Sequence, residues 1–523
     1  MSKPLKVEPP EARFPPQIPF IIGNEACERF SFYGMRNILT IFLVTHLLFN
    51  LPEAERENGA KEIFHVFVMG VYFFPLLGGW LSDRFLGKYK TILWLSIIYC
   101  GGHLCLALFE SSRPGFYAGL FLIALGSGGI KPCVSSFVGD QFDKRNKDKA
   151  RVVFDIFYWA IYFGSFFASL LIPLVLERYG AAWAFGIPGI LMLLATFVFW
   201  LGRKRYVVVP PAPSDPHSFL RVMKTALLSK TAGQGRPGLI LAGFGAVLAL
   251  VSLAFWGSLG VVAAICLALV VIMFFGGVGG WIQLDRARGH HPDEALEGVR
   301  AVLRILVIFA LVTPFWSLFD QKASTWVLQA RSLALPGWSW LSNASQMQAL
   351  NPLLVVFLIP FNNIVLYPGL KKLGFDFSPL RRMTFGIALS GVSWIVVGAF
   401  QMAIDRGHTF SILWQVIPYI ILTLAEVFVS ATGLEFAYSQ APARMKGVIM
   451  SFWSLSVTVG SLWVLLVNDS VKSEWVTAKI AEWTVLSATS FQMFFFAVFA
   501  FAAALAFGLY VRRYVLVDHY RKA

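Results

Sequence analysis

Charged residues are scarce in this chain. Only 14% of its 523 residues are Asp, Glu, Lys or Arg, whereas soluble domains carry about 25%. The hydrophobic share is 57%, with 49 Phe and 17 Trp, and the mean hydropathy is +0.67. These values exclude a soluble globular domain and indicate a protein that crosses a lipid bilayer many times.

Cysteine is also scarce, and the usual motifs of hydrolases and metalloenzymes are missing. The five cysteines lie in or beside apolar segments without a paired extracellular spacing, which argues against disulfides. The sequence has no H-E-x-x-H or G-x-S-x-G motif, and His290 and His291 are neighbours in a polar stretch. We therefore expect no enzyme, no metal and no other cofactor. The net charge of +15 does not require a nucleic-acid partner, because Lys and Arg collect in the cytoplasmic loops of membrane proteins.

The chain contains a long series of apolar segments. Six precede residue 205, two follow a proline-rich polar break, and six more follow a second polar break. They lie near 19–49, 62–82, 89–109, 114–138, 152–174, 182–201, 239–256, 258–283, 301–321, 348–367, 380–403, 411–436, 446–467 and 488–511. Because about 20 apolar residues suffice to span a bilayer as a helix, the sequence predicts an all-α integral membrane protein with fourteen spans.

The polar breaks divide the chain into five predicted regions. These are a tail at 1–18, a six-helix bundle at 19–205, a linker with two extra transmembrane helices at 206–298, a second six-helix bundle at 299–513, and a tail at 514–523. When the spans are alternated, Lys/Arg clusters such as 84–90, 144–151 and 203–205 fall on one side of the membrane. The positive-inside rule then places both termini in the cytoplasm.

The first span carries an unusual polar stripe between Asn24 and Asn37. Glu25, Glu28, Arg29 and Arg36 lie within roughly 140° of one another, together with two aromatic residues, at about 100° per residue. Each charge at bilayer depth costs about 2.5–3.5 kcal/mol. The stripe must therefore face other helices or a water-filled cavity.

Two loops at corresponding places suggest an internal repeat. The loop after the second span reads G-G-W-L-S-D-R-F-L-G-K-Y-K, and the loop after the span near 348–367, the second span of the second bundle, reads Y-P-G-L-K-K-L-G-F-D-F-S-P-L-R-R. The first, with Asp83 and Arg84, resembles the signature loop of the major facilitator superfamily. The expected fold is therefore a major facilitator fold, with two pseudo-symmetric six-helix halves around a midplane site and two extra helices between them.

Five further motifs resemble a narrower family, the proton-dependent oligopeptide transporters, abbreviated POT. They are E-A-C-E-R-F from Glu25, G-S-G-G-I-K-P from Gly126, F-Y-W-A-I-Y-F-G-S from Phe157, P-F-W-S-L-F-D-Q from Pro314 and G-L-E-F-A-Y-S-Q-A-P from Gly433. The extra pair of spans resembles the bacterial branch. The resemblance implies a symporter that imports di- and tripeptides by alternating access, with protons as the coupling ion. It also implies a multi-pass protein of the bacterial inner membrane that functions as a monomer.

The resemblance assigns the two charged ends of a peptide to different halves of the protein. Arg36 and Lys131 would hold the carboxylate, Glu426 would meet the ammonium group, and Asn351 would be a polar partner. Apolar and aromatic walls accept many side chains without demanding hydrogen bonds. The aromatic candidates are Tyr33, Tyr72, Tyr158, Tyr162, Trp316 and Trp453.

The same resemblance suggests groups for proton coupling and for gating. The proton-coupling candidates are Glu25, Glu28, Arg29, His65 and Glu426. Lys131 and Glu426 would pair to close an inner gate when the site is empty, and Asp320, near the outer face, is a further gating candidate. Asp320 lies about 24 Å from Arg304 along a straight helix, so each needs another partner.

Two points stay open at this stage. The family also contains carriers of nitrate and other small anions, so such an anion is the alternative cargo, although an anion has no use for an acid at Glu426. Three residues also depart from the family pattern: Phe32 replaces a tyrosine, Cys133 an asparagine, and Tyr162 an asparagine tied to peptide binding. The last change narrows the expected pocket.

Overall fold

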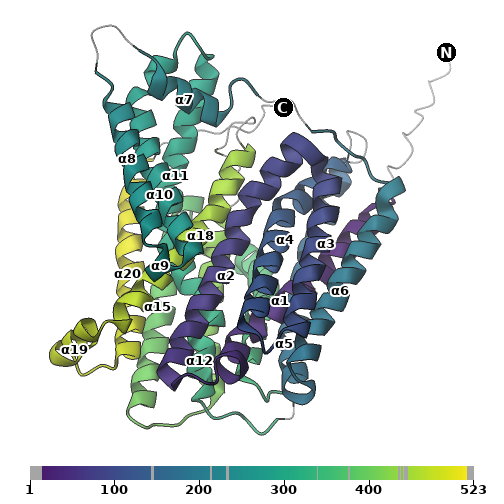
Figure 1. Ribbon diagram of the computed structural model, residues 1–523, viewed down its shortest axis with the longest axis vertical. Helices are drawn as coiled ribbons and strands as arrows, with labels where there is room; N and C mark the ends of the chain where they lie inside the picture. Colours follow the sequence, from purple (N-terminus) through teal and green to yellow (C-terminus); the bar gives the residue numbers. More distant parts are fainter. Residues whose placement is uncertain are drawn as a thin grey trace.

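The computed structural model describes residues 14–142, 147–211, 215–230, 235–338, 340–374, 377–433, 436, 440 and 446–514. These residues form helices and connecting turns, with isolated β-bridges but no named strand among them. Most helices run roughly parallel to one another in a tall bundle (Figure 1). The helices of the early sequence lie together on one side, and most of those of the late sequence lie on the other.

The helices fall into three consecutive groups. The first group is α1 (Ile18–Phe42), α2 (Glu53–Leu81), α3 (Gly87–Leu108), α4 (Arg113–Asp140), α5 (Lys147–Tyr179) and α6 (Ala181–Leu201). The second is α7 (Phe219–Leu228), α8 (Pro237–Ala254), α9 (Trp256–Leu259) and α10 (Val261–Gln283). The third is α11 (Asp293–Asp320), α12 (Thr325–Arg331), α13 (Leu350–Phe361), α14 (Tyr367–Lys372), α15 (Pro379–Asp405), α16 (Val416–Glu426), α18 (Lys446–Lys472), α19 (Glu474–Trp483) and α20 (Ala488–Val511).

The number of membrane spans agrees with the sequence. Twelve helical stretches of the described chain are long and apolar enough to cross a membrane, and one of them, Glu53–Leu108, comprises both α2 and α3. The 25 residues of α1 also reach across a bilayer, at about 1.5 Å per residue. The all-α membrane fold with fourteen spans is thus confirmed, while the domain boundaries at 205 and 298 stay predictions.

Several helices begin or lie outside the apolar segments. The second span begins at Glu53, not near 62, and the ninth begins at Asp293, not near 301. Both starts follow a proline and have acidic residues in the first turn, which suits a helix N-terminus. The sequence analysis also missed α7 and α19, because a ten-residue helix with one apolar face leaves no long hydrophobic run.

Buried apolar side chains form two large cores. One comes from α1 to α6 and includes Ala323, Val327 and Leu328 from around α12. The other comes from α7, α11 and the helices that follow. Tyr72 on α2 packs against both cores. The first and the third group of helices therefore meet at a shared interface.

Hydrogen bonds join the two groups near the C-terminal end of α1. The Thr40 hydroxyl donates to the Ala323 carbonyl at 2.7 Å, and the Gln348 amide donates to the Asn37 carbonyl at 2.9 Å. The Gln346 amide donates to the Leu170 carbonyl at 3.0 Å. These contacts lie toward the α12 end of the molecule, opposite α7 (Figure 1). The halves are therefore tied together at that end.

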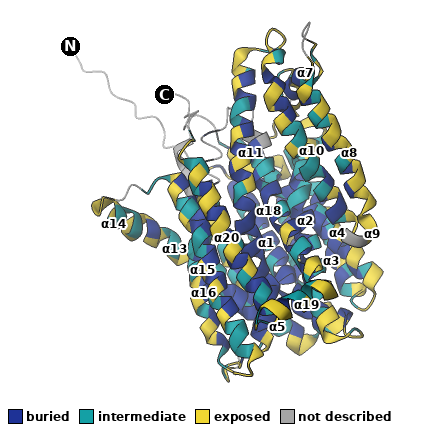
Figure 2. Cartoon of the chain, turned by 90° about the vertical axis from the view of Figure 1, so that its left-hand side faces the viewer, coloured by how far each residue is buried: buried dark blue, intermediate teal, exposed yellow. Residues whose placement is uncertain are grey.

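The outer surface suits contact with lipid. Figure 2 shows exposed positions along α8, and the exposed residues there include Ile240, Phe244 and Leu250. The same view shows α13 and α14 standing away from the bundle, and no residue of α14 is buried. Exposed aliphatic and aromatic side chains on a membrane helix cost nothing in hydrocarbon, whereas they would be unfavourable in water.

A π-helical turn lies at the end of the second span and another at the end of the span near 348–367. Residues Ser82–Leu86 form such a turn after α2, and residues Asn362–Leu366 form one after α13. The first turn lies inside the first of the two matching loops, and the second turn directly precedes the other loop, which begins at Tyr367. The shared local geometry supports a repeated plan for the two halves.

Glycines bring α4 very close to α2. A Cβ at Gly78 would lie 2.0 Å from the Gly129 carbonyl oxygen, and a Cβ at Gly128 would lie 2.5 Å from the Val71 carbonyl oxygen. Small residues let membrane helices approach backbone to backbone. This contact fixes the height and rotation of α4, which carries Lys131, relative to α2.

We predict that Gly78→Ala destabilises the protein, because the added methyl group collides with backbone that cannot rotate away. The expected loss is about 1–3 kcal/mol, as for overpacking in general, seen as a lower melting temperature of the detergent-purified protein. Gly79→Ala is the matched control, because a Cβ at Gly79 meets nothing within 4 Å. Equal melting temperatures for the two variants would contradict the close packing of α2 and α4.

Candidate functional site

The polar stripe of α1 is buried inside the protein. The Arg29 guanidinium lies 3.1 Å from the Glu25 carboxylate and also pairs with Glu28. The Ser127 hydroxyl of α4 donates to Glu28 Oε1 at 3.3 Å. Glu28 is 1% exposed, so the stripe faces other helices, as its insertion cost requires. Two of the predicted proton-coupling residues, Glu25 and Glu28, therefore share the third, Arg29.

A second ion pair crosses between the two halves. Arg36 Nη2 on α1 lies 2.8 Å from Asp320 Oδ1 at the end of α11, and both side chains are buried. The Arg36 guanidinium also stands over the Phe64 ring, 5.1 Å from its centroid. Asp320 thus has the partner that the sequence left unnamed, and one predicted peptide-binding cation is already engaged. Arg304 is exposed elsewhere.

Lys131 is held by aromatic rings. Its Nζ lies 4.2 Å from the Tyr72 ring centroid and 4.8 Å from the Phe32 ring centroid. Among the described residues no carboxylate lies within ion-pair distance of it, so the predicted gate pair with Glu426 is not formed in this structure. Phe32, which departs from the family pattern, thus supplies a π face to Lys131, where a tyrosine would add a hydroxyl.

Glu426 on α16 belongs to a polar chain within the second half. Asn351 Nδ2 donates to Glu426 Oε2 at 2.6 Å and to the Thr423 hydroxyl at 3.1 Å. Lys322 Nζ donates to Asn351 Oδ1 at 2.9 Å. The predicted neighbours Asn351 and Glu426 are therefore in contact, and Asn351 links the acid to a buried lysine.

Sequence reasoning missed Lys322. This lysine is 5% exposed, and its Nζ stands 3.2 Å from the Phe319 ring centroid. The apolar segment ends at residue 321, so hydropathy alone places Lys322 in a loop outside the membrane. Its position directly after the matched motif that ends in Gln321 was the available signal.

The backbone is irregular immediately after Glu426. Residues Val427–Ala431 form a π-helical turn between α16 and the rest of that span. Such turns insert one extra residue into a helix and are frequent at functional sites. The turn frees local backbone from regular packing at the level of the acid.

His65 lies deeper in the protein than the sequence suggested. It was placed at the start of the second span, but α2 begins at Glu53, so His65 is already more than three turns inside the helix. It is fully buried, and its Nε2 lies 3.0 Å from the Ser324 hydroxyl. The side chain therefore connects α2 to the segment between α11 and α12.

The predicted aromatic residues do not form one continuous wall. Trp316 and Trp453 are both buried and pack against each other, with ring centroids 5.8 Å apart at an interplanar angle of 82°. The Tyr33 ring packs edge to face against Phe32, with ring centroids 5.3 Å apart, and Tyr162 is partly buried. Tyr158 is 51% exposed. The structure thus separates a tryptophan pair in the second half from tyrosines that lie around the charged groups.

Two helical halves with ionisable groups buried where they meet define a multi-pass transporter of the major facilitator type. Cations on α1 and α4 stand on one side, and an acid on α16 stands on the other. The profile of the POT family matches residues 89–484, and the chain belongs to this family. The family and the relatives below are transporters, so the expectation that the chain is not an enzyme is confirmed.

Several curated proteins resemble the chain in sequence. "Peptide transporter 3" of Caenorhabditis elegans is 34% identical over 414 residues, which cover 76% of this chain and 52% of the relative. "Solute carrier family 15 member 2" of Homo sapiens is 32% identical over 414 residues, which cover 76% of this chain and 50% of the relative. The chain thus spans about half the length of these relatives.

Solved structures resemble the whole chain. The crystal structure of an "auto inhibited POT family peptide transporter" is 65% identical, with a TM-score of 0.94 over 97% of this chain and 99% of that one. That of "the POT family transporter PepTSo" is 63% identical, with a TM-score of 0.95 over 97% of this chain and 100% of that one. The suspected family is thus confirmed, and the roles of individual residues stay predictions.

We predict that Asp320→Asn destabilises the protein by about 3 kcal/mol or more, because it leaves the buried charge of Arg36 without a partner. Melting of the purified protein measures the loss. The double variant Arg36→Gln/Asp320→Asn should lose less than the sum of the two single variants. Asp285→Asn is the control, since Asp285 pairs with Arg300 at the exposed surface and should change stability by about 1 kcal/mol or less. Additive losses would disprove coupling between Arg36 and Asp320.

Proposed function

We propose that the chain is a proton-coupled symporter that imports di- and tripeptides by alternating access. Membership of the POT family supports this function, as do relatives that are named peptide transporters. We further propose that it acts as a monomer in the bacterial inner membrane, with both termini in the cytoplasm and no cofactor besides the coupling proton.

The observation that carries the proposal is the placement of opposite charges in opposite halves. Lys131 on α4 has rings around it but no carboxylate at ion-pair distance among the described residues. Glu426 on α16 is only partly buried and has amide and hydroxyl neighbours. A zwitterionic peptide would meet Lys131 with its carboxylate and Glu426 with its ammonium group, and charge-assisted bonds of this kind are strong. Such a ligand would hold the two halves together.

Arg36 and Lys322 already have partners, so a ligand would have to compete with those partners. Arg36 is held by Asp320, and Lys322 is held by Asn351. A peptide carboxylate that reached Arg36 would compete with Asp320, which is the gating role proposed for that acid. The ammonium group at Glu426 would compete with the link through Asn351 to Lys322. Peptide binding would thus loosen contacts that exist in this structure.

The proton would be carried by the α1 stripe. Glu25 and Glu28 share Arg29, so protonating one carboxylate leaves the other still paired. Neutralising a buried acid removes its desolvation penalty. Glu28 also touches Ser127, four residues before Lys131 on the same helix. A proton on the stripe would therefore be sensed by the helix that presents Lys131.

The alternative cargo, nitrate or another small anion, has less support. The relatives named above are described as peptide transporters. A small anion also has no hydrogen to donate to the Glu426 carboxylate, whereas an ammonium group has. The charge arrangement therefore favours a ligand with an ammonium group.

We predict that the purified protein in proteoliposomes takes up labelled dialanine when an inward proton gradient is imposed. Unlabelled di- and tripeptides should compete, whereas alanine, tetra-alanine and nitrate should not, because only di- and tripeptides span both poles. Uptake that nitrate abolishes and dialanine does not affect would refute peptide transport.

The same assay contains its coupling control. Glu25→Gln/Glu28→Gln should lose gradient-driven uptake and keep exchange of peptide against peptide, because exchange needs no net proton movement. If gradient-driven uptake survives in this variant, the stripe does not carry the proton.

We predict that Glu426→Gln weakens dialanine binding about ten-fold or more, which corresponds to the loss of one charge-assisted contact. Half-maximal inhibition of uptake, or displacement of a fluorescent peptide, measures this change. N-acetyl-dialanine, which has no ammonium group, should bind the variant and the unmodified protein alike. Glu474→Gln on exposed α19 is the control. An undiminished preference for the free amine in Glu426→Gln would exclude Glu426 as the ammonium site.

A further inference from the structure

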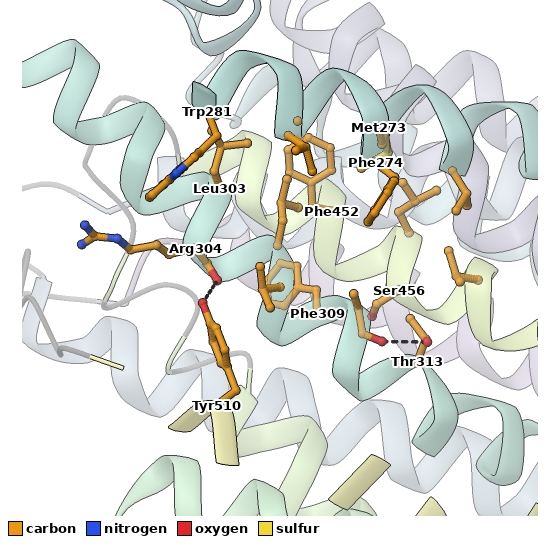
Figure 3. Close-up of a pocket in the computed structure, with 18 of the residues that line it drawn as sticks. Met273, Phe274, Trp281, Leu303, Arg304, Phe309, Thr313, Phe452, Ser456 and Tyr510 are labelled. Atoms are coloured by element: carbon orange, nitrogen blue, oxygen red, sulfur yellow. Dashed lines mark hydrogen bonds between the residues drawn. The ribbon is translucent and has the colours of Figure 1, made fainter. Parts of the chain in front are cut away.

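A large groove lies away from the charged site, between α10 and the second half. Its volume is about 800 Å³, and it is lined by α10, α11, α18 and α20. Aromatic residues from three of these helices face it, among them Phe274, Phe309 and Phe452 (Figure 3). Phe274 is 64% exposed, so the groove opens on the surface that faces lipid.

The groove ends where α10 touches both halves. Ala263 and Cys266 near the start of α10 pack against Met69 of α2 and against Leu462 and Leu465 of α18. At Gly277 an added Cβ would meet only the Leu303 side chain, at 3.7 Å, and beyond the groove Leu284 and Ala287 are buried in the core of the second half. Residues at both ends of α10 are thus packed against the bundle, and the groove lies between them.

The deep part of the groove offers nothing to a polar ligand. Thr313 Oγ1 donates to the Ala310 carbonyl at 2.8 Å and accepts from Trp463 Nε1 at 3.2 Å. The Ser456 hydroxyl donates to the Trp453 carbonyl at 2.6 Å. The hydrogen-bonding groups present are therefore already satisfied, and an apolar occupant suits this part.

The other end of the groove is cationic. Arg304 on α11 and Arg513, just after α20, both line it and both are exposed. Neither has a carboxylate within ion-pair distance among the residues that the structure describes. The Arg304 guanidinium points away from the aromatic centre of the groove (Figure 3) and lies 5.8 Å from the Trp281 ring centroid. Tyrosine and tryptophan beside arginine are typical of a membrane–water interface.

The length of the groove fits half of a bilayer. Thr313 lies nine positions after Arg304 along α11, which corresponds to about 13.5 Å. The hydrocarbon core is about 30 Å thick, so one leaflet contributes about half of that. Cations at the head-group level and an apolar slot one leaflet deep match one lipid molecule.

We propose that this groove binds one anionic phospholipid from the leaflet on the side of Arg304 and Arg513. Its phosphate group lies at the two arginines, and an acyl chain lies between Phe274 and Phe452. The lipid fills the space between the extra helices and the second half, which protein side chains leave open.

Native mass spectrometry of the full-length protein tests the charge requirement. Phosphatidylglycerol and phosphatidylcholine with identical acyl chains are supplied in equal amounts. One phosphatidylglycerol should remain bound, and Arg304→Gln/Arg513→Gln should weaken its binding about five-fold per arginine. Arg512→Gln is the matched control, since Arg512 is also exposed but does not line the groove. Equal retention of the two lipids, or equal loss in the control, overturns the proposal.

A second pair of variants tests the apolar slot without changing charge. Gly277→Phe should displace the lipid because the new side chain fills the groove. Gly276→Phe should retain it, because Gly276 faces open space and does not line the groove. Both variants should elute as monodisperse protein with the melting temperature of the unmodified chain. Lipid retained in Gly277→Phe shows that the groove is not a lipid site. So does an unmodified protein that forms a dimer without bound lipid and becomes monomeric in Gly277→Phe, because the groove would then be a contact between two copies of the chain.

Discussion

The ion pair between Arg36 and Asp320 is the contact on which the polar interior depends. A single charge at this depth would be strongly unfavourable, so each residue makes the other tolerable. The pair joins α1 to α11 and therefore joins the two halves. It lies near the hydrogen bonds of Thr40 and Gln348, which tie the same end of the molecule together. The contacts that neutralise the buried charges therefore lie beside those that hold the two halves together at this end.

The other charged residues of the site balance one another, as Arg36 and Asp320 do. The described site contains four acids and four bases: Glu25, Glu28, Asp320, Glu426, Arg29, Arg36, Lys131 and Lys322. Their formal charges cancel, as expected for groups that share a low-dielectric interior. A zwitterionic peptide leaves this balance unchanged, whereas a proton changes it by one. In the proposed cycle the proton would therefore alter the electrostatics of the site, and the peptide would redistribute the pairs.

The sequence predicted what local spacing and length determine. Glu25 and Arg29 are four residues apart, so their contact on one helical face follows from periodicity. Span number follows from hydrophobic length. The partner of Arg36 did not follow, because Asp320 is 284 positions away and several acids were available. Lys322 was missed since hydropathy ends a span where polarity begins, even when the chain remains buried.

The glycine contact between α2 and α4 has a mechanical consequence. Side chains at a helix interface can change rotamer and let the helices slide, but Gly78 and Gly129 touch through backbone, which has no such freedom. The contact is therefore stiff, and α2 and α4 must tilt together as one rigid body. Lys131 on α4 and the Tyr72 ring on α2, which are in contact, move together with this pair of helices. The separation between Lys131 and Glu426 is then a direct gauge of the angle between the two halves.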